Sequence, residues 1–126
     1  MKNEDKSKSN LRLKDAEEFL ASSQNNLEVG RFKASLDHAI DCVIAANDAF
    51  TIHLIEQVAS TDHHEAIALH KLAGQKISDN KADDLAELLE ERHRKTYRPV
   101  YVNKDLAELM FKKATRFLSW VKEKLK

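Results

Sequence analysis

The chain has 126 residues, which suits one domain with a hydrophobic core of its own. Hydrophobic residues make up 42% and charged residues 33%, as in a globular protein with a well-solvated surface. The formal net charge is zero, so no overall charge excess favours nucleic acid or a membrane surface. The chain contains only two glycines and one proline. Because turns between strands depend on these residues, their scarcity favours long helices with few connections.

The single cysteine, Cys42, excludes an internal disulfide and agrees with a reducing compartment. It lies inside an apolar helical pattern, which predicts a buried, inert thiol. No apolar run approaches the ~20 residues of a membrane span, and no secretory signal pattern is found. We therefore expect a cytoplasmic protein that makes no contact with a membrane.

The first predicted elements are a tail and a long helix. Residues 1–9 are polar and charged, and we expect a mobile tail ahead of a single domain over residues 10–126. A 3–4 apolar spacing predicts a helix from Asn10 to about Val29, with Gly30 in the usual position past a helix end. The residues expected to face inward are Leu13, Ala16, Leu20, Ser23 and Leu27.

A second helix is predicted from near Arg31 to about Val58. The short link at Gly30 makes the first two helices an antiparallel pair. Small side chains widen the apolar surface of the second helix, which is typical of the central helix of a bundle. Its predicted inward stripe is Phe32, Leu36, Ala39, Ile40, Val43, Asn47, Phe50 and Leu54.

Three further helices are predicted, over about His63 to Ile77, over Lys81 to Arg94, and from Asn103 to the C-terminus. Pro99 cannot continue a helix, so an extended connector is expected before the last one. The stripes expected inward are Ile67, His70, Ala73 and Ile77; Ala82, Leu85, Leu88 and Leu89; and Leu106, Leu109, Met110, Ala114, Phe117, Trp120, Val121 and Leu125. The predicted fold is all-α, an up-and-down bundle of about five helices.

Several kinds of catalytic site lack their required residues. A zinc protease helix needs two histidines four residues apart, but the residue four after His64 is Ala68. Asp62, His63 and His64 at a helix start offer at most an adventitious metal site. The chain has no glycine-rich phosphate loop and no Gly-x-Ser-x-Gly motif, which excludes ATPases and α/β-hydrolases of those types. We therefore expect no cofactor and no functional metal.

The most distinctive stretch is Glu87 to Tyr101, where acidic residues give way to basic ones around the only proline. Basic and aromatic side chains are interleaved there: Arg92, His93, Arg94, Lys95, Tyr97, Arg98 and Tyr101. Guanidinium groups bind phosphate at two points, aromatic rings stack on bases, and an imidazole titrates near neutral pH. The alternative is that cations simply end a helix, where its dipole favours them, and pair with nearby glutamates.

Asp37 and Asp41 are four residues apart and therefore share one face of the second helix. Carboxylates near the end of the fourth helix would orient Arg92 through a two-point contact. The alternative is that both aspartates face water.

The chain resembles the HEPN superfamily (higher eukaryotes and prokaryotes nucleotide-binding domain), in its small stand-alone prokaryotic form, over about Leu11 to Leu125. The second helix opens with Arg-Phe-Lys-Ala-Ser-Leu-Asp-His-Ala-Ile-Asp-Cys from Arg31. The fourth helix ends in Arg-His-Arg-Lys-Thr-Tyr, similar to the family's Arg motif. A short proline-containing connector then leads to a last amphipathic helix.

This resemblance implies a helical bundle, commonly dimeric, in which the Arg motifs of two subunits face a shared cleft. Many members are RNases of toxin–antitoxin or defence systems, with an Arg followed after four to six residues by His; others are partners of small nucleotidyltransferases. Arg92 matches the motif Arg and His93 the polar position after it, while Asp37 and Asp41 fall where a polar residue is common. Tyr97 stands where a cleaving member has His, with Arg98 next. Tyrosine, with a pKa near 10, accepts a proton poorly at neutral pH.

Three hypotheses follow. The preferred one is a homodimeric module that binds a nucleotide, RNA or a nucleotidyltransferase partner through Arg92, Arg94, Tyr97, Arg98, Asp37 and Asp41. The second is a metal-independent RNase toxin that uses Arg92 and His93. The third is a purely structural helical dimer.

Overall fold

The structure, a computed structural model, describes residues 1–60, 62–96 and 100–126, without the side chains of residues 93–96. Five helices form the described fold: α1 (Ser9–Glu28), α2 (Phe32–Ile55), α3 (His63–Gln75), α4 (Ala82–Thr96) and α5 (Lys104–Lys124). The short strands β1 (Lys2–Asn3) and β2 (Gln57–Val58) pair antiparallel, and a 3-10 turn, η1 (Lys6–Lys8), precedes α1. The predicted all-α bundle of five helices is confirmed.

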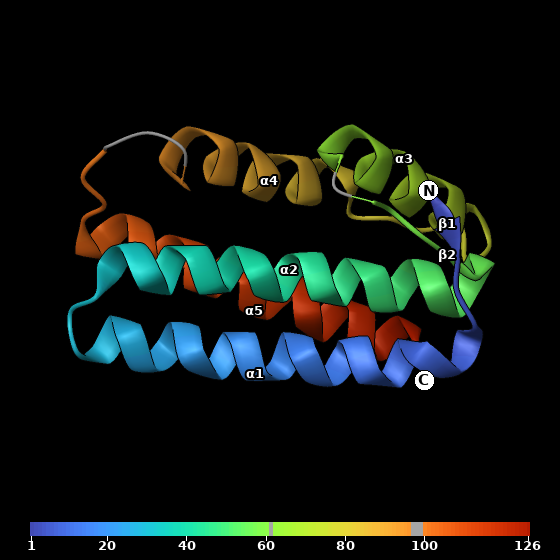
Figure 1. Ribbon diagram of the computed structural model, residues 1–126, viewed down its shortest axis with the longest axis horizontal. Coiled ribbons are helices and arrows are strands. Elements are labelled where there is room, and N and C mark those ends of the chain that lie inside the picture. Colours follow the sequence, from blue (N-terminus) through green and yellow to red (C-terminus); the bar gives the residue numbers. More distant parts are fainter. Residues whose placement is uncertain (61, 97–99) are drawn as a thin grey trace.

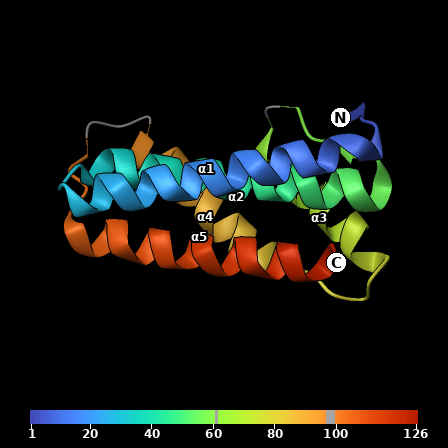
Figure 2. The same ribbon diagram turned by 90° about the horizontal axis from the view of Figure 1, so that it is seen from below.

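Helix α2 is the centre of the bundle and contacts each of the other four helices. Helices α1 and α2 run antiparallel along their whole length, and α5 packs against both (Figure 1). Helices α3 and α4 follow one another along the side of α2 away from α1, as both views show (Figure 2). The prediction that the second helix is central is thus confirmed, and its small side chains Ala39, Ala45, Ala46 and Ala49 are fully buried.

The predicted inward stripes are buried or half-buried with one exception. Leu109 is 45% exposed, so its assignment to the core was wrong. At 3.6 residues per turn, Leu109 lies roughly 110° around the helix axis from the centre of the buried stripe of α5. The three-residue spacing from Leu106 alone did not indicate this angle. Ala107 and Leu118, which the prediction omitted, are buried instead.

The N-terminal segment, which we expected to be a mobile tail, is bonded to the end of α2. The backbone N–H of Glu4 donates to the carbonyl of Glu56 at 2.9 Å, next to the β1–β2 pair. The buried hydroxyl of Ser9 donates to the carbonyl of Ala49 at 2.9 Å. The second helix is shorter than predicted: α2 ends at Ile55, because Glu56 adopts a left-handed conformation, with φ at 51°.

Both glycines have structural reasons for their positions. Gly30, with φ at +83°, follows α1 and reverses the chain into α2, as its place in the sequence predicted. Gly74 lies in the last turn of α3, where an added Cβ would stand 2.5 Å from the carbonyl oxygen of Asp79. The chain between α3 and α4 therefore folds back closely over a helix position that only glycine permits.

His70 is the most buried polar side chain of α3, with no exposed surface. Its ring stacks on Phe50, with centroids 4.8 Å apart, and lies near Phe117 and Trp120. Its Nε2 accepts the backbone N–H of Lys81 at 2.8 Å, which assigns the ring proton to Nδ1 and makes Nδ1 the donor to Asn47 Oδ1 at 2.8 Å. His70 thus fixes α3, the start of α4 and α2 to one another as a neutral imidazole.

We predict that stability falls as the pH drops through the range in which His70 must stay neutral. Burial lowers the pKa of His70 from 6.5 to about 4, so below pH 6.5 the unfolded chain takes up a proton that the folded chain does not. This difference removes about 2 kcal/mol between pH 7 and pH 5, and about 3 kcal/mol by pH 4. Urea unfolding of the wild type and His70→Gln at both ends of this range measures it.

The His70→Gln variant should be less stable near neutral pH but should lose less on acidification. His64→Gln is the matched control, because His64 is exposed and should keep the wild-type pH dependence. Equal pH dependence in the wild type and His70→Gln would contradict the assignment.

Candidate functional site

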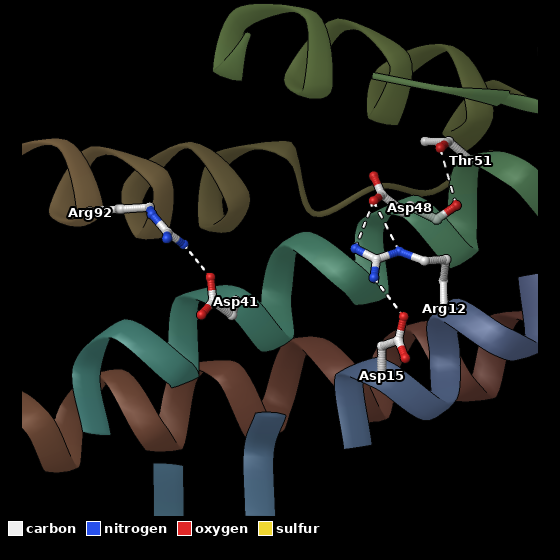
Figure 3. Close-up of polar contacts among 6 residues, drawn as sticks. All are labelled: Arg12, Asp15, Asp41, Asp48, Thr51 and Arg92. Carbon is white, nitrogen blue, oxygen red and sulfur yellow. Dashed lines mark hydrogen bonds and ion pairs between the residues drawn. The ribbon is translucent and has the colours of Figure 1, made fainter. Parts of the chain in front are cut away.

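Arg92 projects from α4 toward α2 and meets Asp41 there (Figure 3). Its Nη1 donates to Asp41 Oδ1 at 2.5 Å, and the side chains are 21% and 26% exposed. The guanidinium is therefore bonded to a carboxylate at the protein surface, where it is neither fully exposed nor fully buried. The predicted approach of Arg92 to Asp41 is found in the structure, through one carboxylate oxygen.

A cavity of about 280 Å³ opens beside this pair. Helix α2 lines one wall, the segment between β2 and α3 lines another, and α4 contributes two leucines and Arg92. Asp41, Asp48 and Asp62 give the cavity an acidic lining, with His63 at its edge. Leaving His63 aside, Arg92 is the cationic side chain among the described residues that line the cavity.

The sequence reasoning missed a second Arg–Asp pair on the same wall. Asp48 accepts from Nε and Nη2 of Arg12 at 3.2 and 2.9 Å, while Nη1 of Arg12 donates to Asp15 Oδ2 at 2.7 Å (Figure 3). Burial raises the pKa of Asp48, and the charge of Arg12 partly offsets this. Asp41 and Asp48 are seven residues apart, so both lie on one face of α2. The available signal was a carboxylate directly beside the apolar run Ala45-Ala46 and Ala49-Phe50.

The carboxylates of the cavity all have partners. Asp62 caps α3 by accepting the backbone N–H of His64 at 2.9 Å, while Asp41 and Asp48 bond to arginines. Among the described residues, no group of three or more His, Cys, Asp or Glu side chains is arranged to hold a metal ion. The three carboxylates of the cavity are therefore bonded within the protein, two of them to arginines and one to a backbone N–H.

The remaining predicted site residues lie in different places. Asp37 is half-buried on α2, one turn before Asp41, and is not among the described residues that line the cavity. His93 and Arg94 belong to the end of α4, although their side chains are not described. Tyr97 and Arg98 lie outside the described residues.

Cys42 is excluded as a nucleophile. It is free and fully buried, as predicted, and burial raises the pKa of its thiol to about 12. A thiol with that pKa carries almost no thiolate at neutral pH, and the thiolate is the reactive form. Cysteine chemistry therefore plays no part in the site.

Comparison with family models finds one that covers almost the whole chain, described as HEPN domain and matching residues 9–124. Comparison with curated proteins finds no match. No helix formed by the described residues combines the length and apolar character that a bilayer crossing needs.

We predict that the two Arg–Asp pairs contribute unequally to stability. Arg12→Ala should cost about 3 kcal/mol, because it leaves Asp48 charged with its side chain only 16% exposed. Arg92→Ala should cost about 1 kcal/mol or less, because Asp41 is 26% exposed and better hydrated. Chemical denaturation of the two variants at neutral pH provides the measurement. A larger loss of stability for Arg92→Ala would show that the Arg92–Asp41 pair, too, is mainly structural.

Proposed function

Because the chain belongs to the HEPN domain family, we propose that it is a nucleotide- or RNA-binding module centred on Arg92. The observation that carries this proposal is the contact between Arg92 and Asp41 at the edge of the cavity. A guanidinium fixed in place before a ligand arrives loses less conformational freedom on binding than a mobile one. Arg92 would thus offer a phosphate an oriented, partly exposed cation.

The sequence around Arg92 supports a phosphate ligand. His93, Arg94, Lys95 and Arg98 follow it within six residues, so cations are concentrated in one part of a chain with no net charge. A guanidinium carries five N–H donors, and its planar fork matches phosphate oxygens. Asp41 acts in this proposal as a positioning residue that holds Arg92, with Asp37 one turn away.

Binding is favoured over cleavage by the identity of residue 97. Family RNases carry a histidine at the corresponding place, whereas this chain has Tyr97, whose phenol seldom loses its proton at neutral pH. RNA cleavage is the second candidate, because His93 adjoins Arg92 in α4 and imidazole transfers protons near neutral pH. Its test is incubation of RNA with the protein in EDTA, comparing the wild type with Arg92→Ala and His93→Ala.

The finer proposals concern assembly. We propose a cytoplasmic homodimer in which Arg92, Arg94, Tyr97 and Arg98 of two copies line a shared cleft, and a small nucleotidyltransferase as the protein partner in a system of the toxin–antitoxin type. Light scattering at several protein concentrations tests the dimer. Co-expression with the neighbouring nucleotidyltransferase gene, where one exists, tests the partner.

We predict that Arg92→Lys weakens nucleotide or RNA binding by about tenfold or more. Lysine keeps the charge but cannot form the two parallel hydrogen bonds that a guanidinium makes with phosphate. Titration calorimetry with nucleotides and fluorescence anisotropy with labelled RNA measure the affinities. Asp41→Asn, which removes the charge that holds Arg92, should weaken binding less than Arg92→Ala does.

The matched control is Arg116→Lys, because Arg116 is exposed on α5 and does not line the cavity. It should bind like the wild type. If Arg92→Lys also binds like the wild type, the arginine only ends a helix. If the wild type itself binds neither nucleotides nor RNA, the proposed function is wrong.

A further inference from the structure

A second hollow, which no part of the proposed site uses, lies at the end of the bundle where α4 ends and α2 and α5 begin (Figure 1). It has a volume of about 440 Å³ and runs between the first turn of α2 and the connector before α5. Val102, which is 4% exposed, and half-buried Phe32 give it an apolar base. We name this hollow the connector groove.

The side chains around the connector groove combine an exposed ring with positive charge. Tyr101 is 82% exposed and Val100 is 39% exposed, so the connector holds apolar surface in water. Arg31 and Lys33 are exposed on the α2 side of the groove. Its described lining includes these two cations and no acidic residue, in contrast to the three aspartates of the cavity beside Arg92.

These properties fit an unstacked base with its backbone phosphate. An aromatic ring in water gains by stacking on the face of any base, and cations beside it attract the phosphate. The positive end of the α2 dipole lies at the same place and adds to this attraction. A duplex keeps its bases stacked inside the helix and therefore cannot use the ring, whereas a single strand can.

We propose that the connector groove is a binding site for single-stranded RNA, in which Tyr101 stacks on one base and Arg31 and Lys33 contact the adjacent phosphate. The proposal rests on the proposed function and extends it, because it adds a second contact to the strand held at Arg92. The chain passes from Arg92 to Tyr101 in nine residues, and Figure 1 places the end of α4 and the start of α5 at the same end of the bundle. The end of α4 that carries Arg92 and the connector groove are therefore near enough in the fold for one strand to be tested against both.

The test uses fluorescence anisotropy with a short labelled single-stranded oligoribonucleotide and with a duplex of the same sequence. Tyr101→Ala should weaken binding of the single strand by roughly tenfold, whereas Tyr101→Phe, which keeps the ring, should change it by less than about twofold. Binding of the duplex should be unaffected by Tyr101→Ala. Arg31→Gln should reduce the salt dependence of the single-strand affinity by about one counterion.

The control for charge is Lys71→Gln, because Lys71 is exposed on α3 at the opposite end of the bundle. It should leave both affinity and salt dependence unchanged. Unchanged single-strand affinity in Tyr101→Ala, or an equal loss in Tyr101→Phe, would overturn the stacking site. If Arg92→Lys still weakens binding in that case, the proposed function stands and only the connector groove is refuted; a wild type that binds no RNA refutes both.

Discussion

The burial of α2 on most of its sides is the constraint from which the rest of the structure follows. A helix surrounded by four others cannot leave polar groups without partners, because a buried unpaired group costs several kcal/mol. Polar side chains along α2 are accordingly met by side chains of the neighbouring helices. In chain order these pairs are Ser35 with Ser23, His38 with Ser22, Asp41 with Arg92, Asn47 with His70 and Asp48 with Arg12.

These pairs differ in their exposure to water. The buried ones can only hold helices together, whereas a partly exposed one can also contact a ligand. The two serines are fully buried and exchange hydrogen bonds with each other's backbone carbonyls, so they can only fix the spacing of α1 and α2. The Arg92–Asp41 pair joins α4 to α2 beside a cavity, and about a fifth of the arginine side chain is exposed to solvent. The same kind of contact can therefore hold a core together in one place and orient a cation for a partner in another.

The sequence predicted the helices well because their apolar spacing is a local property. The five helices, the role of Gly30 and the burial of His70 and Cys42 all follow from periodicity and composition. It offered the meeting of Arg92 with Asp41, fifty-one positions apart, as one of two alternatives, and the structure has this contact. Spacing alone could not decide between the two, because a four-residue interval places Asp37 and Asp41 on one face of α2 without saying what that face meets.

What the sequence did not predict depends on long-range pairing with little local signal. Lys2 and Asn3 have no strand propensity of note, and their ladder with β2 forms directly after the left-handed Glu56 has ended α2. Arg12 looks like an ordinary surface residue until the fold brings Asp48 to it. Leu109 has apolar spacing to one neighbour but lies at the margin of the stripe, which only packing reveals.

The placement of the two chain ends has a practical consequence. Both N and C lie at the same end of the elongated bundle, away from the end where α4 stops and α2 begins (Figure 1, Figure 2). A group attached to Met1 would disturb the ion pair between its amino group and Glu65, whereas Lys126 is exposed. A fluorophore or affinity handle is therefore best joined to the C-terminus, which lies at the other end of the bundle from the connector groove and outside the β1–β2 ladder.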